Sequence, residues 1–456
     1  MSFFSPRRCV AAAVTVALSN LCVVAADTVG RPETPNTPTQ TNPPAPQTPA
    51  IGQNPPTGTE SDQAFLSDTA KTLEVEKSPL EKFQDNLFSW GGVRPYLADK
   101  YGLTFESSFT LDYSKNFMGG ANTEGDTSRH LFDFRINLDT APLFHLDGGT
   151  FSVDFQNQAG TNGSDDLGDL QGFDNMDADG RTQISELWYE QFLFDKKVRI
   201  KVGKVDANTE FAAPESGTEF LNSSFGYSPS ITAFPTYPDQ ALSANIFVYP
   251  TPWLYLGYGV YDGDAVGDHP PHTAWTGPSD WFQIAEIGVK WALADNTLPG
   301  RFAGGVFYDN ADFATFNGRT QSGTAGAYFI AEQKLFHTNY YAKDDERGVY
   351  AFAQWSFGDE EVNDIRQHLG GGIRWVGPYP KENPDSLGVG FTTAFTSDAA
   401  GSPYSEDSET AIETYYNFQA TSYLSVKPDL QYIIHPGGDA ALDDALVATL
   451  RVTVAF

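Results

Sequence analysis

Apolar and polar residues alternate along most of the chain from residue 101 onward. In the clearest run, 129–139, every second side chain is apolar: Phe132, Phe134, Ile136 and Leu138 alternate with Asp133, Arg135, Asn137 and Asp139. The runs 149–159, 197–206 and 444–456 repeat this period of two. Because successive side chains of a strand point to opposite faces, the pattern predicts β-strands with one apolar and one polar face.

About sixteen such runs follow one another, an even number within the range of single-chain bacterial outer-membrane barrels. The predicted strands are 102–113, 129–140, 149–159, 182–194, 197–206, 239–249, 253–262, 281–292, 300–310, 324–334, 346–357, 366–376, 386–397, 410–420, 424–434 and 444–456.

The connections between these strands alternate in length, as they do in a barrel whose first strand starts in the periplasm. The connections 194–197, 250–253 and 421–423 are short and fall on the predicted periplasmic side. The long connections 115–128, 160–181, 207–236, 263–280 and 398–409 all fall on the other side. One periplasmic connection, 335–345, is longer than this scheme prefers.

One long connection, 207–236, has neither a helical nor a strand period and follows a hairpin made of 182–194 and 198–206. Loops of this length in compact domains are usually functional or disordered. This one is rich in Phe, Asn, Ser and Pro, a composition that favours packing. We expect it to fold into the mouth of the barrel and narrow it.

A soluble two-sheet sandwich is the alternative to a membrane barrel, and two features argue against it. Aromatic side chains gather near strand ends, as in the interfacial girdles of membrane barrels: Trp188, Tyr189, Trp253, Tyr255, Trp281, Trp291, Trp355, Trp375, Tyr415 and Tyr416. Charges of both signs occupy strand positions and suit a wet lumen better than a core: Arg135, Glu186, Lys201, Lys204, Glu286, Lys290, Arg374, Lys427 and Arg451. The sequence therefore predicts an all-β transmembrane antiparallel barrel with an inward-folded constriction loop.

The N-terminal part divides into three segments before the barrel domain, which is predicted to span 86–456. Residues 1–26 have a basic start, an apolar core and a small-residue cleavage site, as in a secretory signal peptide for Sec export. Residues 27–60 are rich in Pro and Thr and predict an extended linker. Residues 61–85 are a lead-in that has room for a short helix and is expected to plug or cap the periplasmic end.

The charge balance excludes several classes of partner. Removing residues 1–26 takes away two arginines and no acidic residue, so the net charge changes from −31 to −33. Such a chain repels nucleic acid and anionic lipid, and it disfavours anions in general. Both cysteines, Cys9 and Cys22, lie in the predicted signal peptide, so no disulfide is expected in the processed chain.

Several blocks, in order, resemble the carbohydrate-selective porin family (the OprB-type porins). Phe-Ser-Trp-Gly-Gly-Val-Arg-Pro-Tyr-Leu-Ala-Asp at 88–99 resembles the family's opening motif. The segments 186–191, 202–206, 220–225, 235–238 and 259–263, with Phe211, resemble its central blocks. The tail resembles its end through Glu413, Tyr416, 428–432, 435–438, Leu450, Arg451 and Phe456. The resemblance covers about 86–456 and implies a sixteen-stranded barrel in the outer membrane of a Gram-negative-type bacterium that passes sugars down their gradient.

A sugar path needs polar groups that exchange hydrogen bonds with hydroxyls, and aromatic faces for the apolar side of the ring. Weak and repeated contacts let the solute leave as well as enter. The candidate pore and constriction residues are Arg135, Glu186, Trp188, Lys204, Asp206, Asn222, Arg374 and Arg451. For each charged residue, the alternative is a lumen group that merely stays hydrated or pairs with a neighbour.

The segment 175–186 nearly matches a calcium-loop pattern, with Asn175, Asp177 and Asp179 at ligand positions and Glu186 at the last one. No helix is predicted on either side and Glu186 falls in a strand. The alternative is an acidic external loop that turns at Gly180. The sequence predicts no cofactor and no metal at a functional centre.

Three functions remain open on the sequence, with small sugars and outer-membrane lipid and lipopolysaccharide as expected partners. The first is passive, carbohydrate-selective diffusion into the periplasm. The second is a general porin, either non-selective or cation-preferring. The third is an outer-membrane scaffold tethered to the cell wall through its N-terminal arm. An enzyme is not expected, because no His-based zinc motif and no Gly-x-Ser-x-Gly elbow occurs. Both a monomer and a homotrimer are compatible with the sequence.

Overall fold

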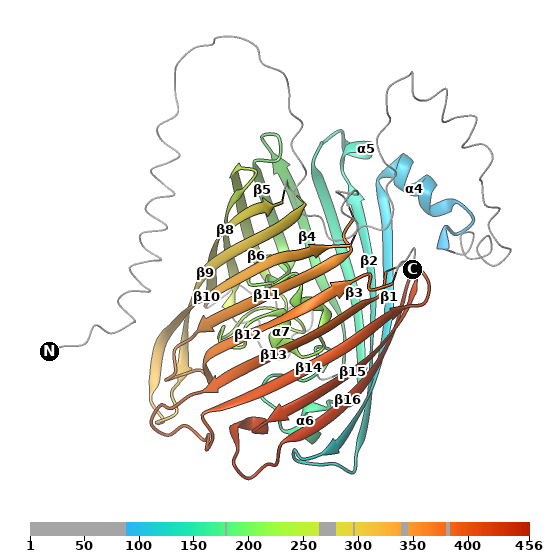
Figure 1. Cartoon of the computed structure of the whole chain (residues 1–456). Coiled ribbons are helices and arrows are strands. Elements are labelled where there is room, and N and C mark those ends of the chain that lie inside the picture. Colours follow the sequence, from blue (N-terminus) through green and yellow to red (C-terminus); the bar gives the residue numbers. More distant parts are fainter. Residues whose placement is uncertain (1–87, 178–179, 264–279, 295–296, 339–344, 380–383) are drawn as a thin grey trace.

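A computed structural model describes residues 88–177, 180–263, 280–294, 297–338, 345–379 and 384–456. Within these ranges, sixteen antiparallel strands form a closed barrel in which β1 pairs with both β2 and β16 (Figure 1). The predicted barrel class is therefore confirmed. The predicted signal peptide, linker and lead-in all lie outside the described residues.

Each predicted run overlaps one observed strand. The strands are β1 (Leu103–Met118), β2 (Asp126–Asp139), β3 (Gly149–Gly160), β4 (Arg181–Leu193), β5 (Val198–Val205), β6 (Ala241–Thr251), β7 (Leu254–Asp262), β8 (Trp281–Leu293), β9 (Leu298–Ala314), β10 (Thr320–His337), β11 (Gly348–Phe357), β12 (Ile365–Val376), β13 (Ser386–Thr396), β14 (Ser408–Gln419), β15 (Leu424–Ile434) and β16 (Ala445–Ala455).

The two ends of the barrel differ in the length of their connections, as predicted. At one end, the short-turn end, β4 joins β5 through 194–197 and β14 joins β15 through 420–423. The other end, the long-loop end, carries 161–180, 206–240, 397–407 and 435–444. In Figure 1 the short-turn end is at the top and the long-loop end at the bottom.

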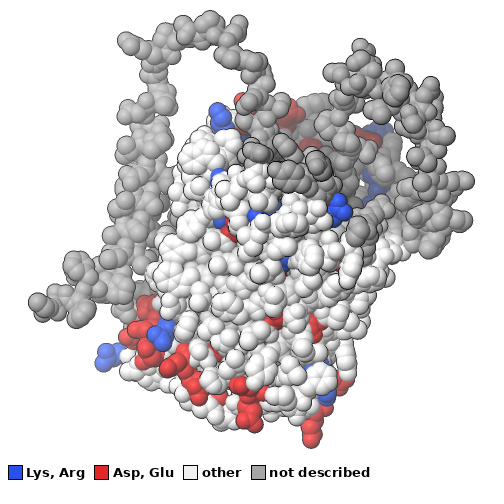
Figure 2. Space-filling view, in the orientation of Figure 1, with Lys and Arg blue, Asp and Glu red and all other residues white. Residues whose placement is uncertain are grey.

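The faces of the wall are inverted relative to a soluble protein. On β3, Phe151 is 47% exposed and points outward, whereas Ser152 and Asp154 are buried on the inner face. Figure 2 shows that the visible outer wall between the two ends carries few charged residues. Acidic residues gather at the long-loop end. An apolar band of this kind faces hydrocarbon in membrane barrels, with the polar face lining the lumen.

Three members of the predicted girdle are wrongly placed, and one of them, Trp188, packs against the buried cluster inside the barrel. Tyr255 is buried inside the barrel, where its hydroxyl donates to Glu286 at 2.7 Å, and Tyr415 is buried against Phe220 of a loop. Trp253, Trp281, Trp291, Trp355 and Trp375 remain exposed on the outside. Strands with aromatic residues on both faces do not reveal from sequence alone which ring points inward.

The helices within the described residues are short: α4 (Val93–Tyr101), α5 (Ala141–Phe144), α6 (Ser164–Leu167) and α7 (Ser223–Gly226). None of them is long and apolar enough to cross a membrane. The α4 helix ends at Gly102, whose φ of 71° is left-handed and whose N–H donates to the carbonyl of Ala98. A Cβ at Gly102 would lie 2.5 Å from the carbonyl oxygen of Asp139, so glycine is required there.

Candidate functional site: the lumen cavity and its loops

The loop 206–240, here called the constriction loop, is tied together at its base. One oxygen of Asp206 accepts hydrogen bonds from the Asn208 N–H at 2.8 Å and the Thr236 hydroxyl at 2.7 Å, and the other accepts from the Tyr237 N–H at 3.1 Å. Burial and the neighbouring Glu186 carboxylate raise the pKa of Asp206 to about 6. Asp206 thus joins the start of the loop to its end.

Carboxylates on the inner wall bind the backbone of the constriction loop. Glu286 on β8 accepts the Ala212 N–H at 3.1 Å, and Glu332 on β10 accepts the Ser216 N–H at 2.9 Å. Arg301 donates to Glu332 at 2.6 Å and to a loop carbonyl as well. Each bond satisfies a backbone donor that has no strand partner, which holds the loop against the wall.

Further along, Glu413 on β14 accepts two successive backbone N–H groups, those of Leu221 at 2.6 Å and Asn222 at 3.0 Å. The side chain of Asn222 is buried and donates to Gln431 on β15 at 3.3 Å. The loop is therefore fixed along its length at β8, β10 and β14–β15. The prediction that this loop folds into the barrel agrees with these contacts.

Aromatic packing adds to these polar contacts. Phe220 and Phe225 of the loop are fully buried and stack with ring centroids 4.3 Å apart. Phe211 stacks on Phe247 of β6 at 5.1 Å. Burying such rings contributes roughly 1.5–3 kcal/mol each. The Phe-rich composition of the segment is thus explained by a core that lies inside the barrel.

Ion pairs complete the attachment of the constriction loop. Glu210 pairs with Arg199 at 2.5 Å and Lys201 at 2.8 Å on β5. Glu219 pairs with Arg374 on β12 at 3.1 Å and Lys427 on β15 at 3.4 Å. Burial alone would raise the pKa of both glutamates, but the paired cations outweigh it and hold each pKa below its usual value. Both carboxylates therefore stay ionised under physiological conditions.

A second loop also enters the lumen, which the sequence did not predict. In the segment 161–180, here called the companion loop, the Leu170 and Gln171 N–H groups donate to Glu409 on β14 at 2.8 and 3.1 Å. The Asn175 N–H donates to the carbonyl of Leu221 in the constriction loop at 2.7 Å. The segment 175–186, interpreted from sequence as an acidic external loop, therefore begins in contact with the constriction loop at Asn175.

A cavity of about 380 Å³ remains open between the two loops and one side of the wall. The loops contribute Asn175, Met176 and Tyr237, and the wall contributes Thr110, Leu131, Asn417, Ser425, Lys427, Arg451 and Thr453. The Tyr237 hydroxyl donates to the Met176 carbonyl at 3.3 Å and so links the loops at the cavity edge. The volume lies within the roughly 300–1,000 Å³ of small-molecule sites.

Arg451 lines this cavity, and its charge is compensated. Its guanidinium donates to Asp112 on β1 at 2.7 Å, to Asp174 at 3.1 Å and to the side-chain oxygen of Asn175 at 2.7 Å. Burial would raise the pKa of Asp174, but Arg451 and Arg129 overcome this and lower it. The cavity wall therefore presents hydrogen-bonding groups with little uncompensated charge.

Two other predicted charged residues, Arg135 and Glu186, belong to a chain of hydrogen bonds that joins the wall to the constriction loop. Arg135 donates to Asp154 at 3.1 Å and to one oxygen of Glu186, and the second oxygen of Glu186 accepts the Asp206 N–H at 3.1 Å. The Arg135 side chain is 32% exposed, so it still faces the lumen water. Lys204 is buried and donates to the carbonyl of Ile184 at 3.0 Å.

Of the eight candidate pore residues, only Arg451 lines the 380 Å³ cavity. Asp206 and Asn222 belong to the constriction loop, and Glu186 and Arg374 contact it from the wall. Tyr237 lines the cavity but was not among the predicted pore residues. The sequence feature that could have identified it is its place in the family-like block 235–238, at the end of the long loop.

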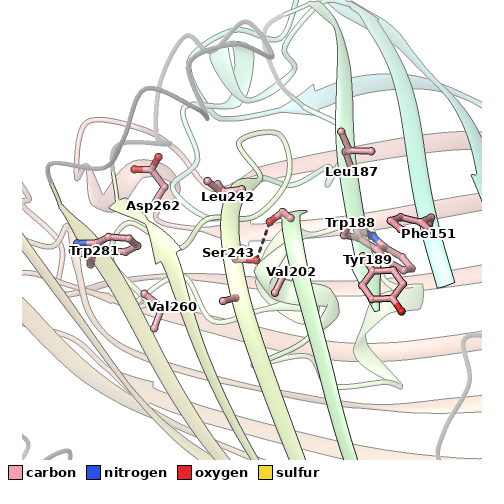
Figure 3. Close-up of a pocket in the computed structure, with 12 residues that line it drawn as sticks. Phe151, Leu187, Trp188, Tyr189, Val202, Leu242, Ser243, Val260, Asp262 and Trp281 are labelled. Atoms are coloured by element: carbon pink, nitrogen blue, oxygen red, sulfur yellow. Dashed lines mark hydrogen bonds between the residues drawn. The ribbon is translucent and has the colours of Figure 1, made fainter. Parts of the chain in front are cut away.

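Trp188 lies at a different hollow, shown in Figure 3, of about 580 Å³ on the outside of the wall. Leu187 and Val202 line that hollow and are exposed with the lipid-facing residues. The Lys201 ammonium lies 3.9 Å from the centroid of the Trp188 ring, a cation–π contact. The larger hollow is therefore separate from the lumen, and Trp188 belongs to the wall beneath Lys201.

The calcium-loop oxygens already contact arginines. Asn175 accepts from Arg451, and Asp177 pairs with Arg129 at 2.6 Å. Asp179 lies outside the described residues. Among the described residues, no three His, Cys, Asp or Glu side chains gather in a way that would hold a metal ion.

Residues 123–456 match the family described as carbohydrate-selective porin, OprB family, which is more than half of the chain. The chain belongs to the carbohydrate-selective porin family. This porin is an outer-membrane channel, and the resemblance in the sequence motifs is confirmed. In such barrels the short turns face the periplasm, so the long-loop end is extracellular.

Related proteins cover nearly the same part of this porin. It is 23% identical over 436 residues to Porin B of Pseudomonas aeruginosa, covering 83% of this chain and 92% of that protein. It is 22% identical over 424 residues to the putative porin QuiX of Acinetobacter baylyi, covering 81% and 92%. The high-pH structure of Pseudomonas putida OprB has a TM-score of 0.72 at 21% identity, covering 81% and 97%, and shares the fold of this porin.

Proposed function

We propose that small neutral sugars cross the outer membrane by diffusing through the cavity between the loops and the wall. Tyr237, Met176 and Leu131 supply an apolar surface there, and Thr110, Asn417, Ser425 and Thr453 supply hydroxyl and amide groups. A sugar ring has the same two kinds of surface. The pairing of Arg451 with Asp112 and Asp174 leaves little net charge to hold an anion. The single observation that supports the proposal most is this cavity, lined from both loops and wall.

Arg135, Glu186, Asp206, Asn222 and Arg374 act in this proposal by shaping the path. Their bonds hold the constriction loop in place, as those between Glu186 and Asp206 illustrate. The names of Porin B and the putative porin QuiX agree with a channel.

Liposome swelling tests the proposal. Proteoliposomes are diluted into iso-osmotic glucose, maltose, sorbitol or arginine, and planar-bilayer currents are measured with each sugar added. We expect faster swelling with sugars than with similar-sized charged solutes, and a concentration-dependent, saturable decrease in current. Currents and rates that depend on solute size alone would contradict sugar preference and leave a general porin.

The acidic extracellular end favours a second candidate function, that of a cation-preferring porin. Asp359, Glu361 and Asp364 lie in one connection at that end, and Figure 2 shows acidic side chains gathered there. Such a field raises the local concentration of cations. The reversal potential in a KCl gradient measures the preference. A strongly cationic potential without any sugar block would favour this second function.

A further inference from the structure

A ledge of exposed aromatic and aliphatic side chains projects from the periplasmic end of the barrel. It consists of Trp90, Val93 and Tyr96, in or before α4, and Leu143, Phe144 and Leu146, in or after α5. Tyr96 is 52% and Phe144 61% exposed, although large rings are usually covered in soluble proteins. We call these six residues the periplasmic ledge. Nothing in the transport path uses them.

The ledge is continuous with the lipid-facing wall. The Trp90 ring lies 5.1 Å from that of Phe105 on β1, and Phe105 lies 6.3 Å from Phe134 on β2. Phe105 pairs with Ile136 on the outer face of the barrel. Figure 1 draws α4 beside the wall near the ends of β1 and β2 and not across the barrel opening. The aromatic rings therefore continue without a break from the hydrocarbon-facing wall, at Phe134 and Phe105, to Trp90 beside α4.

Hydrogen bonds fix α4 in this position. Arg94 donates to the carbonyl of Phe88 at 3.0 Å and also to the carbonyl of Phe105. Phe88 in turn packs against Tyr423, with ring centroids 4.7 Å apart, at a neighbouring periplasmic turn. Because α4 is attached on both sides, its exposed rings have a fixed height relative to the wall.

The polar groups of the ledge are those expected at a membrane surface. Lys100 donates to the Tyr96 hydroxyl at 2.7 Å and lies 5.2 Å from the rings of both Tyr96 and Tyr101. Trp, Tyr and Lys are enriched where hydrocarbon meets headgroups, because each combines an apolar body with a polar tip. Asp99 and Lys100 are both exposed, and with Arg94 the helix carries a net charge of +1, two basic residues against one acidic residue.

We propose that the periplasmic ledge lies in the headgroup region of the inner, periplasmic leaflet and binds glycerophospholipid there. The occupant is the lipid surface itself, because the ledge continues the lipid-facing wall at the level where β1 and β2 end. It acts as an interfacial anchor that sets the height of the barrel in the membrane. Contact with apolar lipid also explains why such large rings are left uncovered by the described residues.

Spin labels of known depth test this proposal in the full-length protein. Cys9 and Cys22, the only cysteines in the sequence, are replaced by serine, and a label is attached at Tyr96→Cys or Phe144→Cys. Leu111→Cys, on the outer wall of β1, serves as the hydrocarbon control, and Ala440→Cys, in an extracellular connection, as the water control. The protein is placed in vesicles of phosphatidylethanolamine and phosphatidylglycerol, and collisions with oxygen and with a water-soluble nickel chelate are compared.

We expect both ledge labels to have a depth between those of the two controls. A Tyr96 label as accessible to the nickel chelate as the Ala440 label would overturn the proposal. So would a label shielded from both reagents, because then a second copy or the residues before Phe88 cover the ledge. In the background Trp90→Ser/Tyr96→Ser, the Phe144 label should move toward the water control while the circular dichroism of the barrel is unchanged. An unmoved label in that folded variant would also contradict an anchoring role.

Discussion

The carboxylate of Glu413 on β14 accepts the backbone N–H of Asn222 at 3.0 Å, although the two residues are 191 positions apart in sequence. The same carboxylate accepts the preceding N–H, that of Leu221. A strand residue thus fixes the middle of the constriction loop through two charge-assisted bonds. Polar residues that point into a barrel therefore serve to hold a loop as well as to line a pore.

Removing this carboxylate should loosen the constriction loop. Glu413→Ala leaves two buried N–H groups without their acceptor, at a cost of about 1–3 kcal/mol for each. We expect noisier single-channel currents with frequent transitions, and a lower thermal unfolding temperature. Glu106→Ala is the matched control, since it removes an inner-face carboxylate of β1 that bonds Asn137 and not the loop. Equal noise in both variants would contradict the anchoring role of Glu413.

The stability of the loop base should depend on pH through Asp206. Burial and Glu186 raise its folded pKa to about 6 from 3.8, so the folded state binds the proton more tightly than the unfolded state. The resulting stabilisation is complete below the unfolded pKa of 3.8 and is lost as pH rises through about 6. At about 1.4 kcal/mol per pKa unit, it amounts to at most about 3 kcal/mol.

Thermal unfolding in detergent at about pH 5 and about pH 7.5 measures this contribution. The wild type should gain more stability at the lower pH than Asp206→Asn, which has no carboxyl to protonate. Asp195→Asn, in the periplasmic turn 194–197, controls for the loss of one acidic residue. If Asp206→Asn keeps the full pH dependence of the wild type, the titrating group lies elsewhere.

The strands were predictable from sequence because the period of two is a local property of the chain. Phe151 and Ser152 show their opposite faces without any knowledge of the rest of the barrel. The inward direction of Tyr415 was not predictable in the same way, because Tyr416 follows it directly. Tyr415 shares the buried face with Ala411 and Glu413, and Phe220, far away in sequence, packs against it there.

The cavity was predicted less well than the strands, because tertiary contacts create it. Met176 and Tyr237 come from different loops and meet through one hydrogen bond. Neither loop has a period that shows which side chains face water. Charges such as Glu186 were recognisable as inner-face residues, but their ion-pair partners were not. Composition therefore identified the class of site, and packing decided which residues line it.

Ion selectivity should depend on Lys427 more than on Arg374. Both pair with Glu219, but only Lys427 lines the cavity. Lys427→Gln removes a positive charge from the path and leaves Glu219 paired with Arg374, so the channel should become more cation-selective. Arg374→Gln is the matched control and should change the reversal potential less. A larger change in reversal potential for Arg374→Gln than for Lys427→Gln would mean that ions pass on the Arg374 side of Glu219.

Sugar affinity should depend on the ring of Tyr237, the aromatic residue that lines the cavity from the constriction loop. Tyr237→Ala removes an apolar face that a sugar ring would cover. We expect a loss of about 1 kcal/mol, or roughly five-fold in the sugar concentration that blocks half of the current. Tyr237→Phe keeps the ring and loses only the hydrogen bond to the Met176 carbonyl, so its half-blocking concentration should stay close to that of the wild type. An equal loss in both variants would show that the link between the loops matters and not the aromatic face. No loss in either would mean that sugars pass elsewhere in the lumen.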